Sequence, residues 1–386
     1  MRALNRCRNA GVSLIELMVA LLIGTILMLG LVEVFSGSRA VYQLSEGLAR
    51  TQENSRFALD YLQRDIRMIG HFGCANDQSH KQQVGAFTSH ITAAAGTPLA
   101  AGTPLDFNLS VQGFEANGTA PDSTLTLASP TAGWTPGLPT HINDLNPRPG
   151  SDIIMMRFLR SNGAAATAIA DDGTKTTVTI ATANWGNLIQ DGVPTPDLFA
   201  VADCSYVDIF ARDGGNVVGS ATANAVIGRY TAQPEGQAAL YRAESIAYYI
   251  ANGASGRPAL WRARWNSAGV AQPEELVDGI ENLQIIYGQD QSADVDSPSG
   301  FIGLQNTAGN AALGDATTVD GEQRWRRVGL VQVGLLASSA NPSSAQAPDA
   351  ASRPSALGVT YAAPADGRFR ASYETTIALR NRLYGN

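Results

Sequence analysis

The hydrophobic pattern changes character about 35 residues into the chain. From Val12 to Val32 the sequence is apolar except at three positions, and these 21 residues match the ~20 that a helix needs to cross the hydrocarbon core of a bilayer. Beyond this run, apolar residues recur at steps of three and four, which predicts an amphipathic helix. Gly70 and Gly73 end the pattern, as glycines do at helix C-termini. The sequence therefore predicts one helix over residues 12–69, apolar in its first half and amphipathic in its second.

The amphipathic half predicts a contact surface. Its apolar stripe includes Leu59, Leu62, Ile66 and Ile69. Such a stripe can bind a partner, but more often it is covered by the rest of the same molecule. We therefore expect the remainder of the chain to form a head that packs on this stripe.

The remaining residues alternate short strand-like runs with turns that are rich in glycine and proline. An amphipathic helix that runs into a strand is expected over 274–289, a hairpin turn at 213–216, and a mobile Pro/Ala/Ser-rich loop over 339–364. The predicted fold class is α+β, with a long N-terminal helix followed by a large, mainly antiparallel β head. The strands expected are 123–128, 152–159, 176–181, 205–211, 217–230, 239–250, 259–265 and 324–338, and 370–383 closes the chain.

A cationic lead with three arginines and no acid precedes the apolar run. A secretory signal peptide would have a shorter apolar region of ~7–15 residues, followed by a small-residue cleavage motif. Here the small residue, Gly11, comes before the apolar run. A cut after Gly11 would remove the charged lead and leave the hydrophobic helix on the mature chain.

Glu16 is the one acid within the apolar run. An ionised side chain at such a position is costly unless it is paired, and it usually has a functional role. If the chain is cut after Gly11, the new amine of Val12 is a cation that could neutralise Glu16 of a neighbouring copy. The alternative is an ordinary signal anchor with a stray acid.

The stretch that begins at Gly11, G-V-S-L-I-E-L-M-V-A-L-L, resembles the class III signal of type IV pilins and pseudopilins. The resemblance implies cleavage between Gly11 and Val12 by a prepilin peptidase, N-methylation of Val12, and Glu16 as the carboxylate that sets the subunit register. The family usually has Phe after the cut, where this chain has Val12.

Three further segments, 53–74, 276–288 and 375–382, are similar to the PilW-type minor pilins, and the middle one is also similar to the J-type minor pseudopilins of type II secretion. Residues 75–273 carry no resemblance to a known family. The organisation implied is a cleaved leader (1–11), a transmembrane half-helix (12–35), an amphipathic half-helix (36–73) and a globular β-rich head (74–386).

The resemblance implies a minor pilin that takes part in initiating, and in capping, a type IV pilus used for twitching motility. Its location would be the bacterial inner membrane with the head in the periplasm, and then the pilus tip. Its implied partners are other minor pilins, the major pilin and a tip adhesin. The alternatives are a J-type pseudopilin, against which the large head weighs, and a tip-located ligand-binding or adhesion module.

Charge and motifs argue against other function classes. The net charge of −7 becomes −10 without the three leader arginines, which disfavours nucleic-acid binding. No H-E-x-x-H, G-x-x-x-x-G-K-[ST], G-x-S-x-G or CxxC motif occurs. We therefore expect a protein that is not an enzyme.

Metal-ligating patterns are weak, and no cofactor is expected. We expect exposed loop histidines rather than a zinc site, although His71 and Cys74 are three residues apart. An acidic cluster is a weak calcium candidate, and a solvated loop is the expectation there because an EF-hand would need Gly and Glu at its sixth and twelfth positions. The histidines are His71, His80, His90 and His141, and the acids are Asp290, Asp294 and Asp296.

The cysteine count becomes even after the predicted cleavage. Of Cys7, Cys74 and Cys204, the first leaves with the leader. The other two would lie in a head that faces an oxidising periplasm, where disulfides persist. We predict a Cys74–Cys204 bond that ties the helix end to the β head; the alternative is two separate buried thiols.

Overall fold

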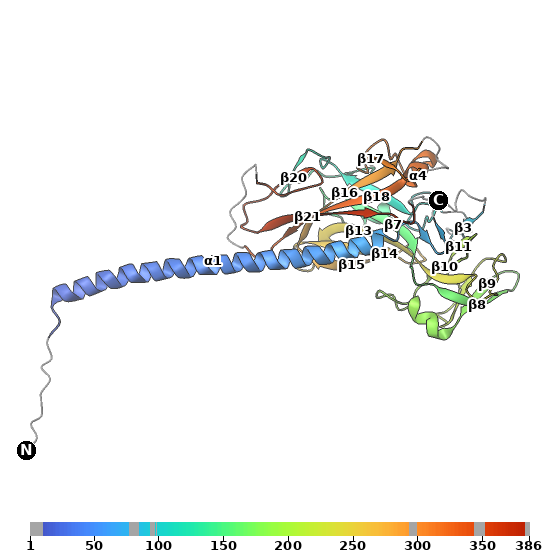
Figure 1. Cartoon of the computed structure of the whole chain (residues 1–386), viewed down its shortest axis with the longest axis horizontal. Coiled ribbons are helices and arrows are strands. Elements are labelled where there is room, and N and C mark those ends of the chain that lie inside the picture. Colours follow the sequence, from blue (N-terminus) through green and yellow to red (C-terminus); the bar gives the residue numbers. More distant parts are fainter. Residues whose placement is uncertain are drawn as a thin grey trace, which may run out of the picture.

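The structure, a computed structural model, describes residues 11–76, 85–92, 97, 99–292, 299–342 and 352–382. A single long helix, α1 (Leu14–Ile66), projects from a β-rich head as a stalk (Figure 1). Its 53 residues give a length of about 80 Å at ~1.5 Å per residue. The chain then passes Gly70 and Gly73, both with positive φ, and enters the head.

A four-stranded sheet lies against the second half of α1. Its strand order is β17-β16-β18-β21, with bounds Ile302–Asn306, Ile280–Asp290, Val328–Ser338 and Arg370–Ala378. All of its pairs are antiparallel. A short helix, α4 (Val319–Trp325), precedes β18. Together with Ile246, Tyr248 and Leu260, the sheet covers Ala58, Leu62 and Ile66 of α1 in one buried core.

A twelve-stranded sheet forms the rest of the head around β13 (Ala239–Asn252). That strand pairs with four others, and it therefore joins the part of the sheet next to α1 to the part that lies farther from the helix. The other strands are β3 (Phe87–Ser89), β4 (Val111–Ala116), β6 (Trp134–Thr135), β7 (Ile153–Leu159), β8 (Ala164–Asp171), β9 (Thr176–Ile180), β10 (Leu198–Ala202), β11 (Val207–Ala211), β12 (Ser220–Ala223), β14 (Pro258–Trp265) and β15 (Ala271–Asp278).

Smaller elements complete the described fold. They are the β1–β2 pair (His71–Phe72 and Ala75–Asn76), a three-stranded sheet of β19 (Ser355–Ala356), β20 (Val359–Ala362) and β5 (Thr124–Thr126), and the short helices α3 (Thr140–Asn143) and η2 (Thr182–Asn187). The fold is thus a long helix followed by a large, mainly antiparallel β head, as the sequence predicts. The stripe of α1 is covered by this head: Leu62, Ile66 and Ile69 are fully buried, and Leu59 is half-buried.

Several local predictions were wrong. The expected helix within 274–289 is instead the end of β15 and the start of β16, separated at Gly279, where φ is +79°. Pairing with β14 and β18 outweighs the helical periodicity of this segment. The predicted strand 324–338 starts only at Val328, because α4 continues to Trp325. Strand β4, fully buried, was missed in a region read as loops and short strands.

Two predicted loops also differ from expectation. The turn at 213–216 joins β11 to β12, but only an isolated bridge, Arg212 to Ala223, connects them, and β12 pairs with β9 instead. The loop 339–364 carries β19 and β20. Its residues 343–351 lie outside the described part of the chain.

Candidate assembly site

The start of α1 is organised by Ser13 and Glu16. The amide of Glu16 donates to Ser13 Oγ (3.2 Å), and the amide of Ser13 donates to Glu16 Oε2 (3.3 Å). This reciprocal arrangement is a capping box, which satisfies amides that have no partner within the helix. Gly11 and Val12 lie exposed just before it. The cleavage, methylation and register roles assigned to Gly11, Val12 and Glu16 remain predictions.

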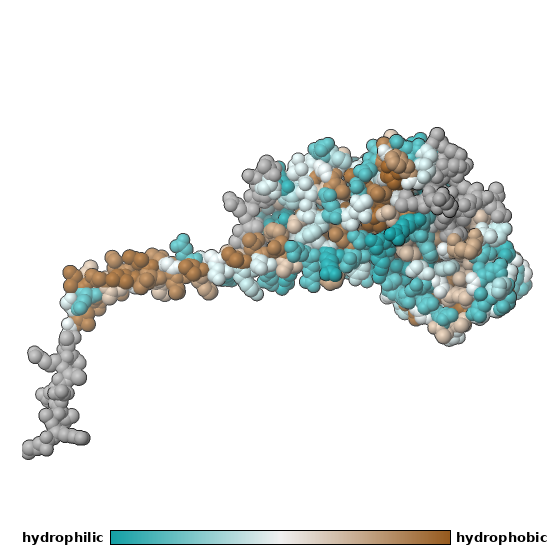
Figure 2. All heavy atoms as spheres, in the orientation of Figure 1, coloured by the Kyte–Doolittle hydropathy of each residue, from teal (hydrophilic) through white to brown (hydrophobic). Residues whose placement is uncertain are grey.

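The first half of α1 presents an apolar surface to solvent. Its large side chains are more than half exposed, for example Leu14 at 79% and Leu29 at 70%, and Figure 2 shows a mostly brown stalk away from the head. By length and composition α1 is one helix that could cross a membrane, and none of its most apolar window is buried. Burial of this surface therefore needs lipid or other chains.

The second half of α1 is fixed to the head by Asp65, which is fully buried. Its carboxylate accepts hydrogen bonds from Tyr248 Oη (2.7 Å), Arg160 Nη1 (3.0 Å) and Arg262 Nη1 (3.3 Å). Asn54 adds a bond from its Nδ2 to the carbonyl of Asp278 (2.9 Å). These directional contacts set how the helix is rotated against the sheets, which apolar packing alone does less specifically.

Asp65 was missed in the sequence, although a signal for it existed. It lies three residues after Leu62 and four before Ile69, so helical spacing places it on the buried stripe. A carboxylate on such a stripe predicts a buried cationic partner. The stripe was interpreted from its apolar members alone.

Behind Asp65, Glu244 continues the ionic network into β13. It lies between Arg160 Nε (3.3 Å), Arg242 Nη2 (2.7 Å) and Arg264 Nε (3.3 Å). Burial alone would raise the pKa of Glu244, but the three guanidinium groups outweigh burial and lower it to about 2. Glu244 is therefore a permanent carboxylate that holds arginines in place, which does not suit a general acid.

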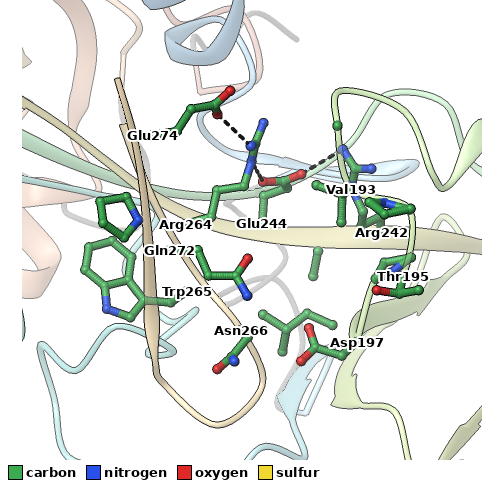
Figure 3. A pocket seen from close by; sticks show the side chains of 16 residues that line it. Val193, Thr195, Asp197, Arg242, Glu244, Arg264, Trp265, Asn266, Gln272 and Glu274 are labelled. Carbon is green, nitrogen blue, oxygen red and sulfur yellow. Dashed lines mark hydrogen bonds and ion pairs between the residues drawn. The ribbon is translucent and has the colours of Figure 1, made fainter. Parts of the chain in front are cut away.

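A pocket of about 430 Å³ opens beside Glu244, lined by the loop that precedes β10 and by β13, β14 and β15. Figure 3 shows Glu244 between Arg264 and Arg242, with Glu274 on the far side of Arg264. The third lining carboxylate, Asp197, accepts from the amide and hydroxyl of Ser267 (2.9 and 2.7 Å). Each of the three carboxylates that line this pocket therefore has a hydrogen-bond or ion-pair partner among the described residues.

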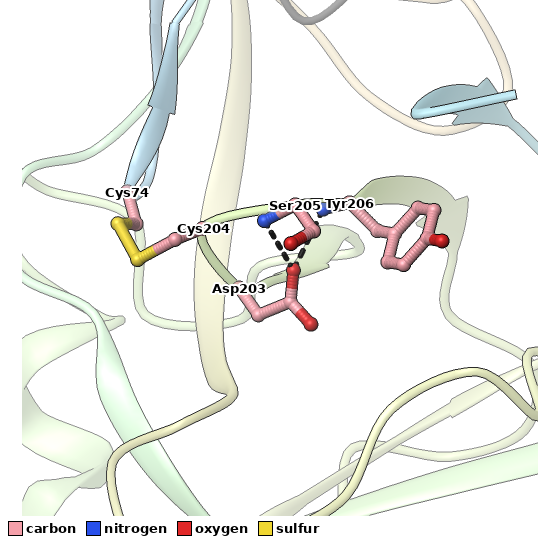
Figure 4. The surroundings of a disulfide bond; sticks show 5 residues. All are labelled: Cys74, Asp203, Cys204, Ser205 and Tyr206. Atoms are coloured by element: carbon pink, nitrogen blue, oxygen red, sulfur yellow. Dashed lines mark hydrogen bonds between the residues drawn. A yellow bond between two sulfur atoms is a disulfide. The ribbon is translucent and has the colours of Figure 1, made fainter. Parts of the chain in front are cut away.

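The disulfide joins Cys74 to Cys204, the pairing expected from the sequence, with a Cα–Cα distance of 4.6 Å. Figure 4 shows it at a turn in which Asp203 Oδ1 accepts the amides of Ser205 (2.7 Å) and Tyr206 (2.6 Å). Cys74 follows β1 soon after α1, and Cys204 lies between β10 and β11. The bond thus links the chain just beyond the helix to the sheet.

The expectation of exposed loop histidines was wrong for the three histidines that the structure describes, since each is partly buried. The Nδ1 of His71 lies 2.8 Å from the carbonyl of Leu159, and the Nε2 of His90 lies 2.6 Å from Asp208 Oδ1. His141 packs edge-on against Trp265, and burial, followed by the charge of Arg157, lowers the pKa of His141 to about 4. His80 lies outside the described residues.

The calcium candidate is only partly described, because Asp294 and Asp296 lie outside the described residues. Asp290 accepts hydrogen bonds from Ser292, Ser299 and Gly300, and burial, which would raise its pKa, is outweighed by these bonds, so that the pKa is lowered. Asp290 thus organises its own loop. Calcium binding there remains untested.

Comparison with known proteins gives two family matches. Residues 247–381 match the family described as type IV pilus-assembly protein W, and residues 6–32 match the prokaryotic N-terminal methylation motif. No curated protein matches the chain. A type IV-like pilin from Thermus thermophilus is similar at 15% identity and a TM-score of 0.23, covering 49% of this chain and 86% of that chain.

The two family matches lie in the parts of the molecule that form the candidate assembly site. The methylation motif covers the capped start of the exposed half of α1. The other match contains all four strands of the sheet that packs on the second half of α1. An apolar stalk with a methylation signal, joined to this sheet, supports the resemblance to PilW-type minor pilins that the sequence indicates.

Proposed function

We propose that the chain takes part in initiating a type IV pilus and then caps it, with its head at the tip. Pilins of this family are structural proteins, so the mechanism is assembly rather than catalysis. The proposed partners are other minor pilins, the major pilin, a tip adhesin, and a prepilin peptidase that cuts between Gly11 and Val12. The chain would be held in the inner membrane, head in the periplasm, before it joins the filament.

The main support for this proposal is the difference between the two halves of α1. Its first half is apolar and exposed, whereas its second half is buried against the head. The exposed half can move from lipid into a bundle of similar helices without a change in the head, because both surroundings bury the same apolar surface. A bulky head on a helix of this kind favours the end of the filament over its closely packed shaft.

Glu16 is the proposed register device. In the proposed mature chain it is the fifth residue, close to the amine of Val12, and it is the first acid of α1. In an apolar bundle the two charges stabilise each other only when neighbouring helices have the right axial offset. The capping box with Ser13 holds the carboxylate near the helix start until a neighbouring amine replaces that contact.

Substitution of Glu16 tests the proposal, with Glu33, a second exposed acid on α1, as the matched control. Glu16→Ala should remain in the inner-membrane fraction but fall at least tenfold in sheared filaments, since an unpaired charge in an apolar bundle costs more than the 1.4 kcal/mol that a tenfold change represents. Glu33→Ala should behave as the unsubstituted chain. Immunoblots of both fractions measure the outcome.

Equal incorporation of Glu16→Ala and the unsubstituted chain would contradict the register role, and an equal loss in Glu33→Ala would show a general effect of charge. Immunogold labelling of single filaments tests the position. Label along the shaft, rather than at one end, would contradict capping.

A further inference from the structure

A second pocket, of about 250 Å³, lies where α1 ends on the head. Apart from Arg242, which lines both, its lining residues differ from those of the pocket in Figure 3. Its polar lining comes from four segments, and Figure 2 shows hydrophilic surface around the end of the stalk. The residues used below are Arg64, Arg160, Asn162, Gln190, Asp191 and Arg242.

Positive charge predominates in this lining. Three guanidinium groups surround one carboxylate, that of Asp191, whose side chain is a quarter exposed. Asp191 Oδ1 lies 3.0 Å from Arg64 Nη1, and its Oδ2 lies 3.5 Å from Arg160 Nη1 and 3.7 Å from Arg242 Nη2. In a chain with a net charge of −7 this is a local cationic site.

The buried carboxylates behind the pocket do not balance it. Counting the network that the described residues form, five arginines (64, 160, 242, 262 and 264) meet four carboxylates, those of Asp65, Asp191, Glu244 and Glu274. One cation is therefore in excess. Asp65 and Glu244 are buried and already shared, and Glu274 lines the other pocket, so Asp191 is the one carboxylate among the described residues that line this pocket.

Two donors in this lining also lack a partner. Arg160 is 8% exposed and Arg242 is 2% exposed, yet Arg160 Nη2 and Arg242 Nε donate to no acceptor in the described part of the chain. A buried donor without an acceptor is unfavourable, because it has lost its hydrogen bonds to water. Both nitrogens are enclosed by protein, so a ligand oxygen meets them only if the arginine side chains move.

We propose that this pocket binds the carboxylate of an aspartate or glutamate side chain on a neighbouring subunit of the filament. Guanidinium groups favour planar carboxylates, which accept two parallel hydrogen bonds. The pocket has room for a side chain rather than a single ion, and the amide pair of Asn162 and Gln190 (3.1 Å) offers polar contacts at its edge. Asp191 occupies part of the site as an internal substitute for that ligand.

Only the identity of the partner rests on the proposed function. The pocket can be tested without a filament, so a failure of assembly and a failure of this site are distinguishable. The probe is the peptide acetyl-Gly-Glu-Gly-amide, with acetyl-Gly-Gln-Gly-amide and inorganic phosphate as comparisons. Each is titrated calorimetrically into the full mature chain in detergent micelles at one low ionic strength.

The chain offers matched variants. Asp191→Asn removes the internal carboxylate and keeps its positive φ of 59°, which Asn tolerates, so the Glu peptide should bind about tenfold more tightly. Arg64→Gln should weaken binding about tenfold, because Arg64 lines the pocket while being half exposed. Arg56→Gln, an exposed change of the same charge on α1, should alter binding less than twofold.

Binding of the Glu peptide but not the Gln peptide, with these changes in affinity, supports the proposal. Equal binding of the two peptides, or no gain in Asp191→Asn, would overturn it. Phosphate binding as tightly as the Glu peptide would overturn it too, because the site would then take a free oxyanion. If Asp191→Asn loses its fold by circular dichroism, the comparison of Arg64→Gln with Arg56→Gln decides the outcome.

Discussion

Replacement of Asp65 by asparagine would remove a negative charge from a fully buried position in the contact between α1 and the head. The side chain keeps its shape, and its remaining oxygen can still accept one hydrogen bond. Arg160 and Arg262 would each lose one carboxylate, but they retain Glu244 and Glu274 respectively. Breaking a buried ion pair costs about 3–5 kcal/mol. Because both arginines keep a second partner, we expect the lower end, about 3 kcal/mol.

The free energy of unfolding can be measured by urea titration of the mature chain in detergent, followed by tryptophan fluorescence, since Trp325 lies in the core that contains Leu62 and Ile66 of α1. Asp60→Asn, an exposed change on the same helix, should shift it by less than about 0.5 kcal/mol. Tyr248→Phe combined with Asp65→Asn should show coupling of about 0.5–3 kcal/mol, because the phenol donates to Asp65. An Asp65→Asn effect no larger than that of Asp60→Asn would refute the reasoning.

Two further predictions concern the head. Cys204→Ser, which opens a loop of 130 residues, should lower the free energy of unfolding by about 2–5 kcal/mol. If thiol labelling of the unfolded, unreduced parent chain already finds two free cysteines, the prediction is contradicted. Burial, and then the charge of Asp152, raise the pKa of Glu115 to about 10, whereas an unfolded glutamate titrates near 4.3. Folding then takes up a proton, so stability is full below about pH 4.5 and falls as pH rises toward 10, by at most about 1.4 kcal/mol per unit. Glu115→Gln should flatten this slope between pH 5 and 9 in urea titrations, and an unchanged slope would exclude Glu115 as its source.

Local patterns in the sequence predict much of the fold, because they reflect interactions within one segment. The apolar run and the later three-and-four spacing specify α1, and the glycines after Ile69 specify where it ends. The disulfide could be predicted by counting, since one of the three cysteines lies in the predicted leader. The segment 274–280 shows the limit: Leu276, Val277 and Ile280 have helical spacing, yet pairing with distant strands makes them extended.

The contacts of Asp65 could not be predicted in the same way, because their members are distant in sequence. Its carboxylate meets Arg160 across 95 residues, Tyr248 across 183 and Arg262 across 197. A helical pattern can place Asp65 on the buried face, but only the sheet order around β13 decides which arginines reach it. The same holds for Arg160, Asp191 and Arg242, which line one pocket from three different segments.

The two charged residues near the ends of α1, Glu16 and Asp65, therefore differ in where their partners lie. At Glu16, the sequence alone indicates a charge in an apolar run, whose proposed partner belongs to another subunit. At Asp65, a charge on the same helix finds its partners within the head, and the tertiary fold supplies them. Because directional ion pairs resist rotation of the helix against the sheets, the orientation of the head follows that of the stalk. In the proposed filament, a register set at Glu16 would thus also determine which face of the head, with its arginine-lined pocket, meets a neighbouring subunit.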